Sequence, residues 1–225
     1  MTSFDILDQT VTLPVLVRDA SSATIMFDVH AAAAQALSPF PVVESAPGRA
    51  QLALALVDYR DNDLGAYHEV GVIFFVQPPG RDAGTYIRHL PVDGEFTNVA
   101  GNVIWGFPKT VQEIKVETTG TTQRWVLTMD GELVLDVTVP RGGTEDMPKM
   151  EMTTYTLRDG VPCATAFSQG GTGSLLTIGG DGVTLSLGSH PVAKELAALG
   201  LPEAPVVLST ALENMQASFG EAVPL

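Results

Sequence analysis

The sequence predicts an α+β fold that is mainly antiparallel β-sheet, with a few peripheral helices, as a single domain over residues 1–225. Two observations support this prediction. Many short segments are rich in β-branched and aromatic residues, and turn signals separate them every 8–12 residues. Helical signals are few and lie near the edges of this pattern, which is typical of a β-rich domain with helices outside the sheet.

The first half of the chain alternates short strands with one helix. A strand signal covers residues 21–29, and the alanine-rich segment 30–37 predicts a helix that ends before Ser38-Pro39. The apolar segments 50–59 and 66–76 flank a polar turn, so we expect them to form a hairpin. After a Pro/Gly loop, residues 86–92 predict a further strand.

The second half continues the β pattern. Residues 103–109 are expected to form a strand, and Gly120 and Asp130-Gly131 separate three strands of a meander. An acidic loop is expected over 140–151. We predict further strands at 153–157, 163–168, 175–178 and 183–187, hairpin turns at the glycine clusters 170–173 and 179–182, and short helices at 190–199 and 208–219.

Composition excludes several classes of function. The chain has 12 Lys and Arg against 26 Asp and Glu, a formal charge of −14, which argues against nucleic-acid and membrane-surface partners. Cys163 is the only cysteine, so no intramolecular disulfide and no cysteine metal cluster can form. The first residues contain no basic segment followed by an apolar one, and no apolar run is long enough to span a membrane. A cytoplasmic protein is the expectation.

Lys109 is the first candidate for a catalytic residue. It ends the run Val-Ile-Trp-Gly-Phe-Pro-Lys, and in a strand Trp105, Phe107 and Lys109 would share one face. An amine beside two aromatic rings loses hydration, which lowers its pKa and makes it a nucleophile. The alternative is an ordinary surface lysine whose stem covers apolar surface.

Glu69 is the candidate partner of this lysine. It lies between Tyr67 and a long hydrophobic run, so its carboxylate faces either solvent or a cavity. A buried carboxylate needs a partner, and a buried Lys109 would be one.

Other common sites have no support in the sequence. Neither glycine cluster has the spacing of a phosphate-binding loop, and the aspartates around Asp61 lack the calcium-loop pattern. The four histidines lack metal-ligand spacing, and no G-x-S-x-G motif is present. We therefore expect neither a metal nor an organic cofactor.

Residues 20–115 carry a family pattern. Gly65-Ala66-Tyr67-His68-Glu69 resembles the G-x-Y-x-E segment of the acetoacetate decarboxylase family, and Gly106-Phe107-Pro108-Lys109 resembles the segment that ends in its Schiff-base lysine. The resemblance implies a sheet wrapped around a closed, cone-like β-barrel with the active site in its cavity. It also implies homo-oligomers, an imine between Lys109 and a ketone substrate, and proton transfer by Glu69.

The resemblance implies a lyase that decarboxylates a β-keto acid. Trp105, Phe107 and Tyr67 are expected to line the substrate site, with Arg88 or Arg60 binding the substrate carboxylate. Two alternatives remain open: aldolase, dehydratase or cyclase chemistry through the same imine, or a binding protein without catalysis. They are motivated by four departures from the family pattern: Asp28, Leu54, Asn102 and Thr110.

Overall fold

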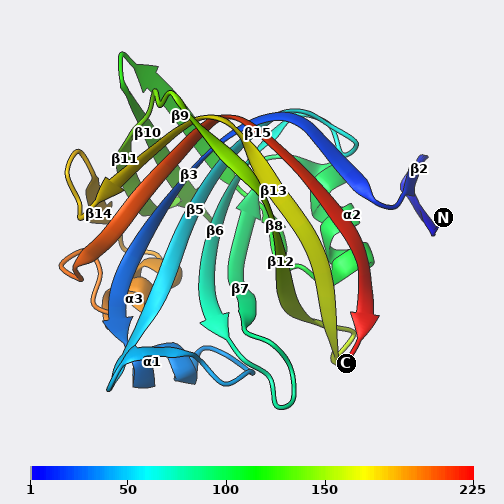
Figure 1. Cartoon of the computed structure of the whole chain (residues 1–225), viewed down its shortest axis with the longest axis horizontal. Helices are drawn as coiled ribbons and strands as arrows, with labels where there is room; N and C mark the ends of the chain where they lie inside the picture. Colours follow the sequence, from blue (N-terminus) through cyan, green and yellow to red (C-terminus); the bar gives the residue numbers. More distant parts are fainter. Residues whose placement is uncertain (1) are drawn as a thin grey trace.

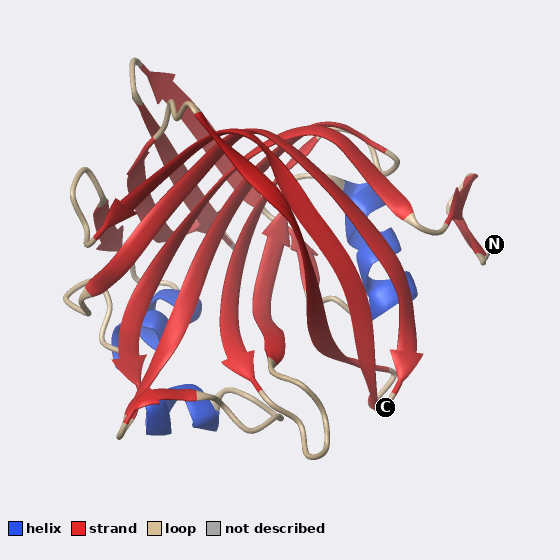
Figure 2. Ribbon diagram, in the orientation of Figure 1, coloured by secondary structure: helices blue, strands red, loops and turns tan. Residues whose placement is uncertain are grey.

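A computed structural model describes residues 2–225 and contains one large, closed, mixed β-sheet. Seven strands form the barrel, each paired with the next one around it. The first and last of them close the barrel through a short parallel pairing. In barrel order the strands are β12 (Glu145–Arg158), β13 (Val161–Ile178), β15 (Val206–Pro224), β3 (Val15–His30), β5 (Arg49–Asn62), β6 (Tyr67–Val76) and β7 (Gly84–Val92). The closed barrel and the scarcity of helices confirm the predicted fold class (Figures 1 and 2).

Two short strands extend the same sheet: β4 (Glu44–Ala46) pairs with β5, and β8 (Lys109–Val111) pairs with β7. The helices lie outside the barrel (Figure 2). A second antiparallel sheet consists of β9 (Glu113–Thr119), β10 (Thr122–Met129), β11 (Glu132–Pro140) and β14 (Thr184–Leu187). The other short strands are β1 (Ser3–Ile6) and β2 (Gln9–Thr12). The helices are α1 (Ala31–Ala36), α2 (Glu95–Trp105) and α3 (Pro191–Ala198). No helix within residues 2–225 combines the length and apolar character needed to cross a membrane.

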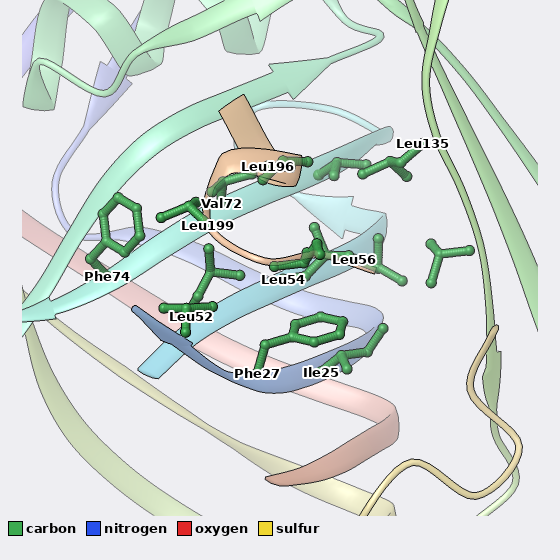
Figure 3. Packing of buried hydrophobic residues seen from close by; sticks show 14 of the residues in the cluster. Ile25, Phe27, Leu52, Leu54, Leu56, Val72, Phe74, Leu135, Leu196 and Leu199 are labelled. Carbon is green, nitrogen blue, oxygen red and sulfur yellow. The ribbon is translucent and has the colours of Figure 1, made fainter. Parts of the chain in front are cut away.

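Strand alternation gives the large sheet two different faces. Ile25, Phe27, Leu52, Leu54 and Phe74 point to the outer side, where they pack with residues of β11 and α3 into the main hydrophobic core (Figure 3). The alternate residues of the same strands point inward and line a cavity; they include Thr24, Met26, Ala53, Ala55 and Phe75. The barrel interior is therefore available for a ligand, because the principal core lies outside it.

The helix predicted over 208–219 is wrong, because this segment belongs to the long strand β15. Its neighbours provide the reason: β15 pairs antiparallel with β13 on one side and β3 on the other. Backbone pairing on both edges outweighs the modest helical propensity of a segment such as Ala211-Leu212-Glu213-Asn214-Met215.

The hairpin turn predicted at residues 170–173 is also wrong, because β13 continues through these glycines and includes the strand expected at 175–178. A side chain on Gly171 would collide with the carbonyl oxygen of Asn214 on β15, and one on Gly170 would meet the backbone of Lys149 on β12. The glycines therefore permit close approach of neighbouring strands. The loop predicted over 140–151 is shorter than expected, because β12 begins at Glu145.

Candidate active site

Lys109 is positioned by a helix end and a short parallel strand. The strand predicted over 103–109 is wrong: α2 continues to Trp105, and Gly106 follows it in the left-handed conformation (φ 69°) that commonly terminates a helix. Lys109 then begins β8, opposite Leu90 of β7. The sharp change of direction at Gly106 brings the lysine side chain back against α2.

Trp105 and Phe107 still lie beside the lysine, although no strand aligns them. Their rings stack with centroids 5.3 Å apart, and both line the barrel cavity with Lys109. The indole Nε1 of Trp105 donates to the carbonyl oxygen of Gly220, 2.7 Å away, which fixes the ring. These two rings form an aromatic part of the cavity wall.

The lysine forms a buried ion pair with Glu69. Lys109 Nζ lies 2.8 Å from Glu69 Oε2, and the two side chains are 3% and 10% exposed. Glu69 is on β6, opposite Val57 of β5, and its alternation with Val70 directs its carboxylate into the barrel. The hairpin β5–β6 and the segment α2–β8 thus bring together two residues that are far apart in sequence.

Three hydroxyl groups complete the polar network. Lys109 Nζ donates to Thr97 Oγ1 at 2.7 Å and to Tyr67 Oη at 3.3 Å. Tyr59 Oη donates to Glu69 Oε1 at 3.2 Å, and the rings of Tyr59 and Tyr67 stack 4.4 Å apart. Both charged groups therefore have neutral hydrogen-bonding partners in addition to each other.

The electrostatics of this network differ from the sequence-based prediction. Burial lowers the pKa of Lys109, but the carboxylate of Glu69 and the hydroxyl of Tyr67 raise it by more, so the pKa lies above its ordinary value. The lowered pKa predicted from the aromatic neighbours is therefore wrong for this resting arrangement. Burial also raises the pKa of Tyr59 and Tyr67, so both remain neutral phenols.

The ion pair faces a cavity of about 380 Å³ inside the barrel. This volume is within the range of sites for small organic molecules. Its wall is mainly aliphatic, aromatic and methionine side chains, with scattered hydroxyl and amide groups. Within residues 2–225, no group of three His, Cys, Asp or Glu residues is arranged to hold a metal ion.

The structure brings together five of the seven predicted site residues: Lys109, Glu69, Tyr67, Trp105 and Phe107 line the cavity. Arg88 does not join them. Its guanidinium is bound to Glu195 of α3, with Nη2 2.8 Å from Oε2, and it is not part of the cavity wall.

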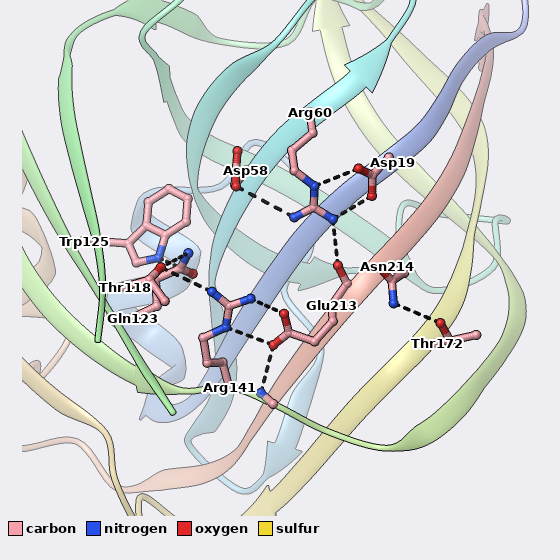
Figure 4. Close-up of polar contacts among 11 residues, drawn as sticks. Asp19, Asp58, Arg60, Thr118, Gln123, Trp125, Arg141, Thr172, Glu213 and Asn214 are labelled. Atoms are coloured by element: carbon pink, nitrogen blue, oxygen red, sulfur yellow. Dashed lines mark hydrogen bonds and ion pairs between the residues drawn. The ribbon is translucent and has the colours of Figure 1, made fainter. Parts of the chain in front are cut away.

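Arg60, the other arginine proposed from the sequence to bind a carboxylate, also lies outside the cavity. It binds Asp19 in the cluster shown in Figure 4. Alternation along the strands explains both results, because the neighbouring residues Tyr59 and Ile87 are the ones that line the cavity.

The four departures from the family pattern also lie outside the cavity wall. Leu54 is buried in the outer core, and Asp28 pairs with Arg49. Thr110 is exposed on β8. Asn102 is on α2, where its amide donates to the carbonyl oxygen of Lys109 at 3.1 Å. Asn102 thus holds the backbone of the lysine, whereas Thr110, the residue after Lys109, is exposed to solvent.

Three residues of the site were not identified from the sequence: Thr97, Tyr59 and Gly101. Thr97 and Gly101 lie on α2, and their role depends on a helix that the sequence did not reveal. A side chain on Gly101 would meet Lys109 Cδ at 2.5 Å, so this glycine makes room for the lysine stem. Tyr59 could have been found from hairpin register, because it lies directly opposite Tyr67.

Comparison with solved structures supports the assignment of the fold. The acetoacetate decarboxylase from Legionella pneumophila subsp. pneumophila str. Philadelphia 1 is 16% identical, with a TM-score of 0.71 over 94% of this chain and 87% of that one. A structure described as acetoacetate decarboxylase is 19% identical, with a TM-score of 0.69 over 96% of this chain and 90% of that one. The enduracididine biosynthesis enzyme MppR, complexed with pyruvate, is 16% identical, with a TM-score of 0.56 over 95% and 87%.

Sequence comparison assigns the family. Against curated protein sequences the chain gives no significant match. The family model described as acetoacetate decarboxylase (ADC) matches residues 8–166, which include the hairpin that carries Glu69, the helix α2 and Lys109. The matched region is more than half of the chain and contains every residue of the buried ion-pair network. The chain belongs to the acetoacetate decarboxylase family.

Proposed function

We propose that this protein is a Schiff-base lyase that decarboxylates a β-keto acid through an imine on Lys109. The observation that carries the proposal is the buried ion pair of Lys109 and Glu69 at the wall of an apolar cavity. An amine is the nucleophile that an imine requires, and a carboxylate 2.8 Å away can accept its proton. Family membership makes this chemistry the first to test.

The first step forms the imine. Glu69 takes a proton from the Lys109 ammonium, and the neutral amine adds to the substrate ketone to give a carbinolamine. Return of the proton to the carbinolamine hydroxyl releases water and leaves an iminium ion on Nζ. Tyr67 and Thr97, which hold Nζ in the resting state, keep the nitrogen in place during this exchange.

The second step breaks the carbon–carbon bond. The electron pair of the bond to the carboxylate moves towards the iminium nitrogen, which releases CO2 and leaves an enamine. Glu69, a carboxylate again after the first step, takes up a proton from solvent and delivers it to the enamine carbon, which restores the iminium. The water lost earlier is regained when the iminium is hydrolysed. The overall reaction converts a β-keto carboxylate and one proton into a ketone and CO2. Trp105 and Phe107 contribute apolar surface to the cavity in which these steps take place.

A second candidate function uses the same imine for aldol, dehydration or cyclisation chemistry. The similarity to MppR favours it, because structures of that enzyme contain pyruvate and the condensation product of pyruvate with imidazole 4-carboxaldehyde. An α-keto acid of that kind has no carboxylate placed for decarboxylation through the iminium. Both candidates require the imine on Lys109 and differ only in which bond of the substrate breaks or forms.

Reduction with borohydride tests the shared step. Incubation with a β-keto acid or an α-keto acid, followed by borohydride and mass spectrometry of the peptides, should add the mass of the reduced substrate or product at Lys109. Lys109→Ala is the control and should not be labelled. Release of CO2 from the β-keto acid then distinguishes decarboxylation from the alternative. Absence of any adduct at Lys109 would exclude both candidates.

A further inference from the structure

The charge of the cavity wall is unusual for an enzyme that binds an acid. Among the residues that line it in the described chain, Glu69 and Lys109 are the only ones with a charge, and they neutralise each other at 2.8 Å. Every other polar side chain of the wall is neutral. A carboxylate placed away from Lys109 would have no cation to replace its hydration, which is costly in an apolar site.

The nearby arginines do not change this conclusion, because each is held by a carboxylate outside the cavity. Arg88 binds Glu195. Arg60 binds Asp19, and Arg141 binds Glu213, as Figure 4 shows. The single cation available to a substrate is therefore the lysine that reacts with it.

The shape of the cavity points to a long occupant. Its wall follows β6 from Glu69 to Phe75, two residues six positions apart and therefore roughly 20 Å apart at about 3.3 Å per residue. A four-carbon keto acid would displace only a few water molecules, each of which takes up about 30 Å³. The cavity volume of about 380 Å³ is far larger than the volume of those waters.

The part of the cavity away from the ion pair is mainly apolar, and the hydroxyls of Thr85 and Thr154 at its Phe75 end bond to each other at 2.8 Å. Met26, Ala53, Ile73, Phe75 and Leu208 line it from four strands, β3, β5, β6 and β15. Met147, Met150 and Met152 of β12 also line the cavity. Methionine side chains are flexible and adapt to apolar ligands of varied outline, so this wall is suited to an alkyl or aryl chain.

We propose that the substrate is a β-keto acid with one acidic group, next to the reacting carbonyl, and an apolar tail that extends from Lys109 towards Phe75. This inference rests on the proposed function and specifies its substrate class. The tail is the part that the cavity recognises, and a second charged group at its far end is rejected. The reaction releases CO2 and leaves an apolar ketone.

A chain-length series tests the proposal. We expect kcat/KM for CO2 release to rise at least tenfold between β-keto acids of four and about eight carbons, since each methylene that becomes buried contributes at most about fourfold. A carboxylate added to the far end of the longer substrate should lower kcat/KM at least tenfold. A flat or falling series, or equal turnover of the dicarboxylic substrate, would overturn the proposal.

Two variants test the position of the tail. Ala53→Phe should fill the apolar end and reduce the ratio of kcat/KM for the long substrate to that for the short one at least tenfold, and Phe75→Ala should shift the preferred length upward. Ala46→Phe, a matched substitution on the exposed strand β4, should leave the ratio unchanged. If Ala53→Phe does not fold, Phe75→Ala alone decides, and an unchanged length preference overturns the assignment.

The failure of this inference can be distinguished from the failure of the proposed function. Borohydride trapping of short and long substrates on Lys109 without a preference for length would leave the imine chemistry in place and overturn the substrate class. Absence of trapping at every length would overturn both, because the substrate class depends on the imine.

Discussion

Glu69 and Lys109 face each other across 2.8 Å inside the barrel, one from the hairpin β5–β6 and the other from the strand that follows α2. Tyr59 holds the carboxylate, while Tyr67 and Thr97 hold the amine. Each charge of the pair is thus satisfied by the other and by neutral hydroxyl groups. Removing one member of this network should therefore have measurable effects on both stability and reactivity.

The first prediction concerns the stability of the pair. Lys109→Met should destabilise the fold by about 2 kcal/mol at pH 7. This is less than the roughly 3–5 kcal/mol lost when one partner of a fully buried ion pair is removed, because the cavity admits water to Glu69. The double variant Lys109→Met/Glu69→Gln should recover most of the loss, since it leaves no buried charge. Denaturant unfolding of the wild type, both single variants and the double variant measures this coupling. A double variant as unstable as the sum of the single variants would contradict it.

The second prediction concerns pH. Because the pKa of Lys109 is raised, the neutral amine is a minor species at neutral pH, and the rate of borohydride trapping should increase as the pH rises towards that pKa. Glu69→Gln removes the carboxylate that raises the pKa and leaves the effect of burial, which lowers it. The pH profile of trapping should therefore move to lower pH in this variant.

The position of the profile on the pH axis is the decisive readout, because loss of Glu69 as a proton acceptor changes the height of the profile as well. A wild-type trapping rate that does not change with pH would indicate a lysine that serves only as a structural cation. It would favour a binding protein without catalysis.

The third prediction concerns Thr97, which is 1% exposed and accepts a hydrogen bond from Lys109 at 2.7 Å. Thr97→Val keeps the shape but removes the acceptor, and it should cost about 2 kcal/mol of stability, as expected for a hydrogen bond to a charged group. It should also favour the neutral amine and move the trapping profile to lower pH. Thr97→Ser is the matched control. It retains the hydroxyl and should restore most of both properties; equal behaviour of the two variants would exclude a role for the hydroxyl.

The sequence was sufficient to propose the ion pair as one of two alternatives, but not to reveal the network around it. Lys109 and Glu69 were identified as possible partners because each is an ionisable residue within an apolar segment, and alternation in the hairpin directs Glu69 inward. Thr97 was not identified because helix α2 has no strong start signal: its N-cap is Gly94, which offers no side chain for capping. Without that helix, nothing in the sequence indicated that Thr97 lies within hydrogen-bonding distance of Lys109.

The errors in the predicted fold have a common physical cause. The segment that forms β15 has the composition of a helix, and the glycines 170–173 have that of a turn, yet both are strands in the barrel. Pairing with neighbours far away in sequence decided their conformation, and single-sequence patterns contain little information on such pairing. The inward direction of Met26 or Ala53 likewise follows from the closure of the barrel, which no local pattern specifies.

The fourth prediction concerns Gly101, which lies on α2 against the stem of Lys109. A Cβ at this position would meet Lys109 Cδ at 2.5 Å, Cε at 2.8 Å and Cγ at 3.1 Å, all closer than carbon atoms approach without displacement. Alanine stabilises a helix by about 1 kcal/mol relative to glycine, which offsets the cost of this close contact, so the free energy of unfolding of Gly101→Ala should change little. The contact should instead displace the amine from Glu69 and the cavity. Trapping at Lys109 should fall at least tenfold, because small displacements of a reacting group have large effects on rate. Val103→Ala, at an exposed position of the same helix, is the control and should retain normal trapping. If Gly101→Ala traps substrate as well as the wild type, the close contact between this helix and the lysine stem does not position the amine.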